Sequence, residues 1–372
     1  MKPIIKWPGG KSREIDKIKS FIPEYDRYIE PFFGGGALFF HLAPQQAAIN
    51  DISEDLMEYY SLIQIQDSAF YELLLCYSNS FSDLLSACQK KLPALVHLFF
   101  QFRKPLPLVQ DPSSELERMV ASIAVEISSD FYERLVLDKE EFLAVLLQMA
   151  KDKFDRTIVN YNKKPFSTED LCENLVTGFT SGYYMYFRKV FNDIRLKRMA
   201  VPSRQYKAAN FYFIREYCYG SMFRYNAKGE FNIPYGGMSY NKKDMQSKIK
   251  NMFNDEIAAL FANTAISCTD FEAFLQEVQP TENDFIFLDP PYDTEFSDYE
   301  GNDFTKFDQE RLARALIHTP AKFILVIKNT DFIKGLYENH FNILSFDKQY
   351  TYNVRSRNSR DAEHLIITNL PV

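Results

Sequence analysis

Strands and helices alternate at both ends of this 372-residue sequence, but not in its middle. Residues 1–66 read as a strand, a glycine-rich loop, a helix start and a second strand, and the same alternation returns near Ala265. From about Asp67 to Phe179 the apolar residues instead recur at the spacing of long helices. Residues 1–66 are too few to bury a stable core alone. The sequence therefore predicts one α/β domain that is interrupted by a long insertion.

The segment LDPPYD, residues 288–293, follows an apolar run that is typical of a buried parallel strand. Proline cannot donate a hydrogen bond to a sheet, so the strand must end there. Each proline also restricts the residue before it to extended conformations. Asp289 and Tyr292 are therefore expected on a stiff loop at the carboxyl end of a strand, where open α/β sheets bind ligands. An ordinary turn is the alternative that these residues alone leave open.

A glycine loop, PFFGGGALFF at residues 31–40, joins a strand to a helix. It lacks the G-x-G-x-x-G spacing of dinucleotide sites, because Phe39 stands at the third glycine position. A shorter glycine turn still lets the backbone approach a ligand that has no diphosphate. Asp51 ends the next strand, where a carboxylate can accept hydrogen bonds from a ribose. These features favour a nucleoside with an amino-acid tail, and S-adenosylmethionine fits that description.

The five cysteines and five histidines are dispersed, without the spacing of a zinc site or a disulfide framework. We therefore expect no metal. No stretch reaches the ~18 apolar residues of a membrane span, and the first residues lack the apolar segment of a signal peptide. We expect a cytoplasmic protein that does not act on a membrane.

Positive charge is concentrated in one segment of an otherwise acidic chain. Residues 186–250 contain 14 lysines and arginines against 4 acidic residues, although the whole chain has a net charge of −7. Residues 111–141 are the opposite, with 9 acidic residues and 3 basic ones. A localised basic block is the pattern of a surface that binds phosphates, although such a run can also be a solvated face. Nucleic acid is therefore a candidate partner.

The motifs together resemble a known enzyme family. KWPGGK, EPFFGGGALFF, Asn50-Asp51, Thr269-Asp270-Phe271 and LDPPYD occur in the order found in Dam-like DNA adenine-N6 methyltransferases (D12 class, alpha group). Within the basic block, RYNAKGEFNIPYG is similar to the R-Y-N-x-x-G-x-F-N-x-P-x-G pattern of that family's recognition region. The resemblance covers about residues 1–66 and 181–372, and nothing in residues 67–180 contributes to it.

The resemblance implies a Rossmann-like S-adenosylmethionine-dependent methyltransferase core with a mixed, mostly parallel seven-stranded sheet. Residues 1–66 and 255–372 would form this catalytic core. Residues 67–180 would be a helical insertion of unknown role, and residues 181–254 a target-recognition region with a β-hairpin. The inserted part would be mostly helical.

The family pattern also implies roles for individual residues. The cofactor would be S-adenosylmethionine. Asp51 would hold its ribose, and Asp289 would also border it. Its other neighbours would come from the same motifs: Trp7, Gly9, Gly10, Lys11, Phe33, Gly34, Gly36, Asp270 and Phe271.

The catalytic residues would be Asp289, Pro290 and Tyr292. An adenine amino group is a poor nucleophile, because its lone pair is delocalised into the ring. The Asp289 carboxylate and the Pro290 carbonyl would accept its two N–H bonds and direct the lone pair toward the incoming methyl group. Tyr292 would stack on the base, which must first be flipped out of the duplex.

Residues 215–237, here called the recognition segment, would read double-stranded DNA through a two-stranded ribbon with a turn at Gly229. Arg224 is the expected guanine contact, with a phosphate contact as the alternative. Tyr219 would wedge between bases and Lys6 would reach a flanking base. Asn226, Asn232 and Pro234 would shape the hairpin. Of these, Asn226 and Pro234 would also be DNA-binding residues, with Pro234 close to the DNA.

The target sequence does not follow from the resemblance. Gly220 and Met222 stand where compact family members have asparagine and leucine, and Gly237 stands where an arginine is familiar. We expect a monomer, for which a restriction endonuclease sharing the target site is a candidate partner.

Other activities remain open at this stage. An RNA adenine-N6 methyltransferase and a non-catalytic DNA-binding or partner-docking protein are the main alternatives. Cytosine-N4 methylation and protein-glutamine methylation are disfavoured, because they are usually associated with serine or asparagine in place of Asp289.

Overall fold

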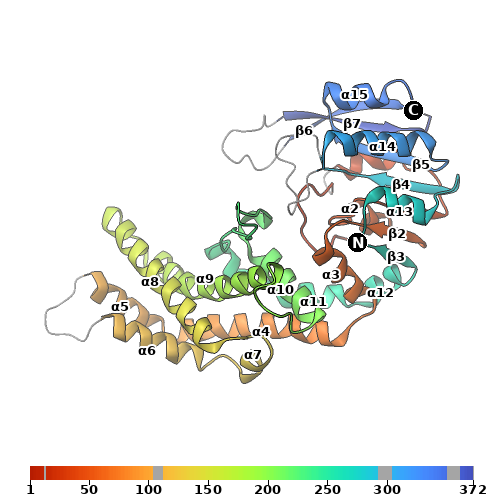
Figure 1. The fold of residues 1–372 in the computed structure, drawn as a ribbon. Helices are drawn as coiled ribbons and strands as arrows, with labels where there is room; N and C mark the ends of the chain where they lie inside the picture. The colour runs from red at the N-terminus through yellow and green to blue at the C-terminus, as the bar shows by residue number, and fades with distance from the viewer. Residues whose placement is uncertain (12–13, 104–111, 292–303, 350–360, 372) are drawn as a thin grey trace. The chain divides into compact units, whose positions relative to one another are not determined.

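The computed structural model describes residues 1–11, 14–103, 112–291, 304–349 and 361–371. The chain divides into two compact units. Unit 1 contains Met1–Ile65 and Asp255–Val372, and unit 2 contains Gln66–Asn254. The two ends of the chain, red and blue in Figure 1, therefore belong to the same unit.

Unit 1 is built on a seven-stranded sheet with the strand order β3-β2-β1-β4-β5-β7-β6. The first five strands in this order are parallel, and β7 runs antiparallel to both of its neighbours. The expected mixed, mostly parallel sheet is confirmed. The strands are β1 (Arg27–Glu30), β2 (Ala47–Asn50), β3 (Thr264–Ser267), β4 (Asp284–Leu288), β5 (Lys322–Lys328), β6 (Asn342–Gln349) and β7 (Asp361–Thr368).

The central strands follow from their composition. Every residue of β2 and β4 is buried, as expected for parallel strands that are covered on both faces. Two short helical elements of unit 1, α1 (Ile15–Ile18) and the 3₁₀ turn η1 (Lys19–Phe21), precede β1, and its other helices lie between strands in the chain (Figure 1). These other helices are α2 (Ala37–Leu42), α3 (Glu54–Gln64), α12 (Asp255–Ala262), α13 (Phe271–Val278), α14 (Lys306–His318) and α15 (Asp331–Tyr337).

The edge strand β6 is not singled out by the sequence pattern. None of residues 342–346 is fully buried, and polar and apolar residues are mixed along the strand. An edge strand pairs on one side only and is partly exposed to solvent, so its composition differs little from that of a loop. Only its pairing with β7 identifies it.

Unit 2 is mostly helical. Helix α9 is 28 residues long and runs without interruption through residue 180, the expected boundary between the helical insertion and the recognition region. The helices are α4 (Ser68–Lys90), α5 (Leu92–Arg103), α6 (Pro112–Ala124), α7 (Ser129–Arg134), α8 (Lys139–Lys163), α9 (Thr168–Arg195), α10 (Arg204–Tyr217) and α11 (Met245–Met252), with 3₁₀ turns η2 (Tyr219–Ser221) and η3 (Met238–Lys242).

Helices α8 and α9 pack closely because α9 has two glycines on the shared face. A Cβ atom at Gly182 would lie 2.8 Å from the Leu146 Cα atom, and one at Gly178 would lie 3.1 Å from the Ala150 Cα atom. Any larger residue would push the helices apart. Helix α9 is thus held in place by α8 of the insertion. The insertion and the recognition segment belong to one compact unit.

Candidate active site

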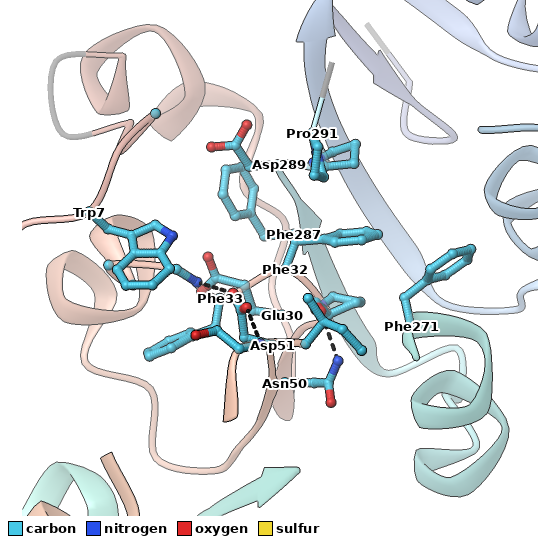
Figure 2. Close-up of a pocket in the computed structure, with 18 of the residues that line it drawn as sticks. Trp7, Glu30, Phe32, Phe33, Asn50, Asp51, Phe271, Phe287, Asp289 and Pro291 are labelled. Atoms are coloured by element: carbon cyan, nitrogen blue, oxygen red, sulfur yellow. Dashed lines mark hydrogen bonds between the residues drawn. The ribbon is translucent and has the colours of Figure 1, made fainter. Parts of the chain in front are cut away.

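A cavity of about 300 Å³ lies at the carboxyl ends of β1, β2 and β4. The strand order reverses between β1 and β4, and ligands of open α/β sheets bind at such switch points. Segments that are far apart in the sequence line the cavity together (Figure 2): residues 7–11, 30–37, 50–53, 269–271 and 289–291.

The glycine loop between β1 and α2 forms a tight turn in the wall of the cavity. Gly34 and Gly36 have φ values of +50° and +61°, in the left-handed region that favours glycine. A Cβ atom at Gly36 would lie 2.5 Å from the Phe33 ring. Asn50, at the end of β2, fixes the turn: its backbone carbonyl accepts from the Phe33 amide (2.8 Å), and its side chain donates to the Pro31 carbonyl (3.0 Å).

Asp51, which follows β2, also lines the cavity next to this turn. Its carboxylate accepts from the backbone amides of Gly34 (2.8 Å) and Ser53 (3.0 Å). Burial raises the pKa of Asp51, and these backbone amides partly offset the increase. The two hydrogen bonds leave lone pairs on both oxygens, so the carboxylate can still accept from a ligand.

Asp289 directly follows β4 and also lines the cavity. Lys11, whose side chain is 2% exposed, donates to one Asp289 carboxylate oxygen. The loop behind it is held by the buried Gln309, which donates to the Pro291 carbonyl at 2.9 Å. Pro290 is buried and lines the cavity. Tyr292, the third residue assigned to catalysis from the sequence, lies outside the described residues.

The amino-terminal KWPGGK segment covers the glycine turn. Trp7 lies against Gly34, where a Cβ atom would be 2.7 Å from the Trp7 Cδ1 atom. Gly9 has a φ of +79°, and its carbonyl accepts from the Lys11 ammonium at 3.4 Å. Gly10 also lines the cavity. Every residue assigned to the cofactor from the sequence therefore borders one cavity.

Three phenylalanines form an aromatic cluster at one end of the cavity. The ring centroids of Phe32, Phe271 and Phe304 lie 5.4 to 5.7 Å apart. A flat ring could pack among them with favourable edge or offset contacts. Phe32 had no role predicted from the sequence, although it lies within the glycine motif.

Glu30 also lines the cavity and had no role predicted from the sequence. It ends β1, is 2% exposed and accepts a hydrogen bond from the Tyr28 hydroxyl at 2.8 Å. Burial raises its pKa well above the ordinary value, the Tyr28 bond lowers it, and the charges of Asp289 and Asp51 raise it further. The signal in the sequence was an acidic residue at the end of a strand, directly before the glycine loop.

We expect Glu30→Gln to stabilise unit 1 increasingly as the pH rises. The folded-state pKa of Glu30 exceeds its ordinary value of 4.5. The wild type therefore loses stability from about pH 4.5 upward, by about 1.4 kcal/mol per pH unit, until the folded-state pKa is passed. Glutamine does not titrate, so the difference in unfolding free energy between variant and wild type should grow over this range.

Urea unfolding can test this, because Trp7 is the only tryptophan of the chain and lies in this site. Its fluorescence should be followed from about pH 4.5 to about pH 7.5. Glu24→Gln, at an exposed position of the same unit, is the matched control and should give a small, constant difference. A constant difference for Glu30→Gln as well would contradict the prediction.

The recognition segment lies in unit 2 and is held by α9. The Asn192 side chain bonds both the amide and the carbonyl of Phe231, at 2.8 and 3.0 Å. Arg195 donates to the Gly229 carbonyl and stacks 3.9 Å from the centre of the Tyr225 ring. Within the segment, antiparallel backbone pairing occurs in two short stretches, around the bridges Tyr225–Phe231 and Cys218–Tyr235.

The expected two-stranded ribbon is formed only in part. The turn at Gly229 is present, with a φ of +74°, and backbone bonds join Asn226 to Glu230 and Asn232 to Arg224 across it. Within residues 218–235, all of which the structure describes, no continuous ladder links this stretch to the Cys218–Tyr235 bridge. The Asn226 side chain is used inside the turn, where it accepts from the amides of Lys228 (2.9 Å) and Glu230 (3.0 Å). Its position agrees with a role in shaping the hairpin.

The other assigned DNA contacts are at the surface. Tyr219 is 50% exposed, and its amide donates to the carbonyl of the exposed Pro234 at 2.8 Å. Arg224 is exposed on the same segment. Lys6 is exposed in unit 1.

The basic block is less available than its composition suggests. At least seven of its 14 basic side chains bond acidic side chains or backbone carbonyls in unit 2: Arg188, Lys189, Arg195, Arg198, Lys242, Lys243 and Lys248. A count of charges along the sequence cannot separate these structural contacts from a phosphate-binding face.

Metal-binding clusters and membrane-spanning helices are both absent from the described part of the chain. It contains no group of three or more histidine, cysteine, aspartate or glutamate side chains that could hold a metal ion. None of its helices combines the length and the apolar character that crossing a membrane requires.

Comparison with known proteins gives full-length relatives. Type II methyltransferase M.CviBI of Paramecium bursaria Chlorella virus NC1A is 24% identical over 377 residues, covering 99% of this chain and 100% of that protein. Type II methyltransferase M.MjaIII of Methanocaldococcus jannaschii is 25% identical and covers 99% of both chains. DNA adenine methylase of Haemophilus influenzae is 26% identical over 84% of this chain and 73% of its own length.

The family match covers both units. Residues 7–86 and 121–352 match the family described as D12 class N6 adenine-specific DNA methyltransferase. The matched ranges include the glycine turn, the recognition segment and the loop after β4. The chain belongs to the D12 class of N6 adenine-specific DNA methyltransferases.

Proposed function

We propose that the protein transfers a methyl group from S-adenosylmethionine to the N6 amino group of adenine at specific sites in double-stranded DNA. One observation carries the proposal. The Asp289-Pro290-Pro291 loop shares a cavity with the glycine turn and Asp51, so an acceptor pair and a nucleoside site lie side by side. The family supports the same reaction.

The residues present fit the proposed cofactor. Gly34 and Gly36 have positive φ values, and the Trp7 and Phe33 rings lie where a Cβ atom would be, so the tight turn requires glycine. The backbone of this turn lines the cavity and would approach the amino-acid part of the ligand. Asp51 offers carboxylate oxygens to ribose hydroxyls, and the Phe32 and Phe271 rings can pack against the adenine ring. Trp7, Gly9, Gly10, Lys11, Phe33 and Asp270 would complete the site. The bound cofactor would supply an electrophilic methyl group.

The chain's own acceptors would prepare the nucleophile. Asp289 would accept one N–H of the target amino group and the Pro290 carbonyl the other, which directs the nitrogen lone pair toward the methyl group. Lys11 occupies one acceptor position of Asp289 and keeps the carboxylate in place. A carboxylate has about four acceptor positions, so the pair leaves room for the base. Tyr292 would stack on the flipped base.

The recognition segment of unit 2 would select the site. Arg224 would bond a guanine edge, Tyr219 would wedge between bases, and Pro234 would lie against the DNA. Asn226 would act through the turn that it stabilises. Lys6 would reach a flanking base. A restriction endonuclease with the same target is a candidate partner, supported by the Type II names of the two full-length relatives.

Long-read sequencing of DNA from cells that express the wild type or Asp289→Ala tests the function. N6-methyladenine confined to one short motif, and absent with the variant, is the expected result. The purified protein should also methylate unmodified DNA with labelled S-adenosylmethionine. Labelling of RNA but not of DNA would favour the RNA alternative. Cofactor binding without any transfer, on either nucleic acid, would favour a non-catalytic DNA-binding protein.

A further inference from the structure

Arg311, on α14, connects three carboxylates at the edge of the cavity. Its two terminal nitrogens bond both oxygens of Asp270, at 2.6 and 3.2 Å. Its Nε atom donates to Glu272 at 2.9 Å, and one terminal nitrogen also donates to Asp308 at 2.9 Å. The Arg311 side chain is only 20% exposed. A two-point arginine–carboxylate contact restrains direction as well as distance.

The network separates residues that line the cavity from those that support them. Asp270 and Asp308 belong to the lining, whereas Arg311 and Glu272 lie outside it. Phe271, next to Asp270, faces the cavity (Figure 2), and the Arg311 guanidinium lies 4.9 Å from the centre of its ring. Arg311 thus holds both a carboxylate and an aromatic ring of the site without being part of its surface.

The Asp270 carboxylate would otherwise be poorly restrained. Its side chain is 43% exposed, and apart from Arg311 it bonds the Glu272 amide at 3.0 Å, as the N-cap of α13. Of about four acceptor positions on the carboxylate, three are thus used. The remaining one is on the oxygen that accepts from Arg311 at 3.2 Å. A fixed acceptor beside a cluster of phenylalanines suits a flat heteroaromatic ring that carries N–H donors.

We propose that Arg311 is a positioning residue that makes the cavity select a purine with an exocyclic amino group over one with a carbonyl at that position. The inference rests on the proposed use of S-adenosylmethionine, whose base is adenine. With Asp270 held by Arg311, an amino group gains a hydrogen bond, whereas a carbonyl oxygen faces a carboxylate that cannot donate to it.

The test compares the affinities of S-adenosylhomocysteine and S-inosylhomocysteine, which differ by an amino group against a carbonyl at purine position 6 and by an unprotonated against a protonated N1. Binding is measured by calorimetry and by Trp7 fluorescence, so no turnover is needed. The wild type should prefer the adenosyl compound by at least about tenfold, since a site that bonds an N–H group rejects an analogue that lacks it. Arg311→Met should reduce this preference to less than about threefold.

Two further variants separate positioning from folding. Arg311→Lys keeps the charge but not the two-point contact, and should also lose most of the preference. Glu272→Gln removes a partner of Arg311 that lies outside the cavity, and should keep the wild-type ratio of the two affinities. Circular dichroism and thermal unfolding would establish that all variants are folded.

The ratio distinguishes the outcomes. If Arg311→Met weakens both compounds equally and keeps the ratio, Arg311 has only a structural role and the inference is wrong. A wild type without preference between the compounds would also overturn it, while the cofactor proposal would stand. If the wild type binds neither compound nor S-adenosylmethionine, the cofactor proposal fails and this inference fails with it.

Discussion

Replacing Asp289 by asparagine is expected to reduce methyl transfer by about 10²–10³-fold or more, the range found when one preorganised catalytic hydrogen-bonding group is removed. Asparagine keeps the shape of the side chain and one acceptor oxygen, but it loses the charge that draws on the adenine N–H bond. The same change should destabilise unit 1 by about 3 kcal/mol, because Lys11 is 2% exposed and loses its carboxylate partner.

A double variant separates the two effects. Lys11→Met combined with Asp289→Asn removes both charges, so most of the lost stability should return, while methyl transfer should stay as low as in Asp289→Asn. Unfolding followed by Trp7 fluorescence gives the stability, and transfer of labelled methyl groups to DNA gives the activity. Equal stability of the single and double variants would show that the ion pair is not the cause. Activity of Asp289→Asn close to that of the wild type would refute the catalytic assignment.

Gly36→Ala is expected to disrupt the glycine turn in the wall of the cavity and to lower the unfolding free energy strongly. The residue has a φ of +61°, and a Cβ atom would lie 2.5 Å from the Phe33 ring. Phe33 cannot easily yield, because it is buried and packs on Phe39 and Tyr60, with ring centroids 5.3 and 4.9 Å away. Left-handed strain and overpacking together should cost about 3 kcal/mol of unfolding free energy.

Gly10→Ala is the matched control. Gly10 also lines the cavity, but a Cβ atom there would meet the Trp7 carbonyl at 3.5 Å, an ordinary contact. Its unfolding free energy should change by less than about 1 kcal/mol. Gly36→Ala should also bind S-adenosylhomocysteine at least about tenfold more weakly, since the turn must move. Equal stability of the two variants would contradict the role given to the turn.

Local chemistry explains why much of the site could be predicted. Residues 285–288 of β4 are apolar, and two prolines stop the strand, so Asp289 was expected on a stiff loop at its carboxyl end. The glycine loop had to be a tight turn between a strand and a helix. These patterns act over a few residues and do not depend on distant partners. The resemblance then placed Trp7 and Lys11 near the same site, and in the structure both line the cavity.

Other features depend on contacts that no local pattern contains. Nothing in the sequence around Arg311 distinguishes it from the other arginines. Only the packing of α14 beside α13 brings it to Asp270. The ion pair of Lys11 with Asp289 joins residues 278 positions apart. The contact of Asn192 in α9 with the Phe231 backbone also joins residues that are distant in the sequence.

The sequence by itself determined the α/β core, its interruption and the residue types at the carboxyl ends of β1, β2 and β4. Apolar periodicity, proline and glycine act locally, so these features follow from composition along the chain. The tertiary structure alone decided which acids are supported by which bases, and which basic side chains of residues 186–250 are already used within unit 2. Charge pairing depends on distances between segments, and those distances exist only once the chain has folded.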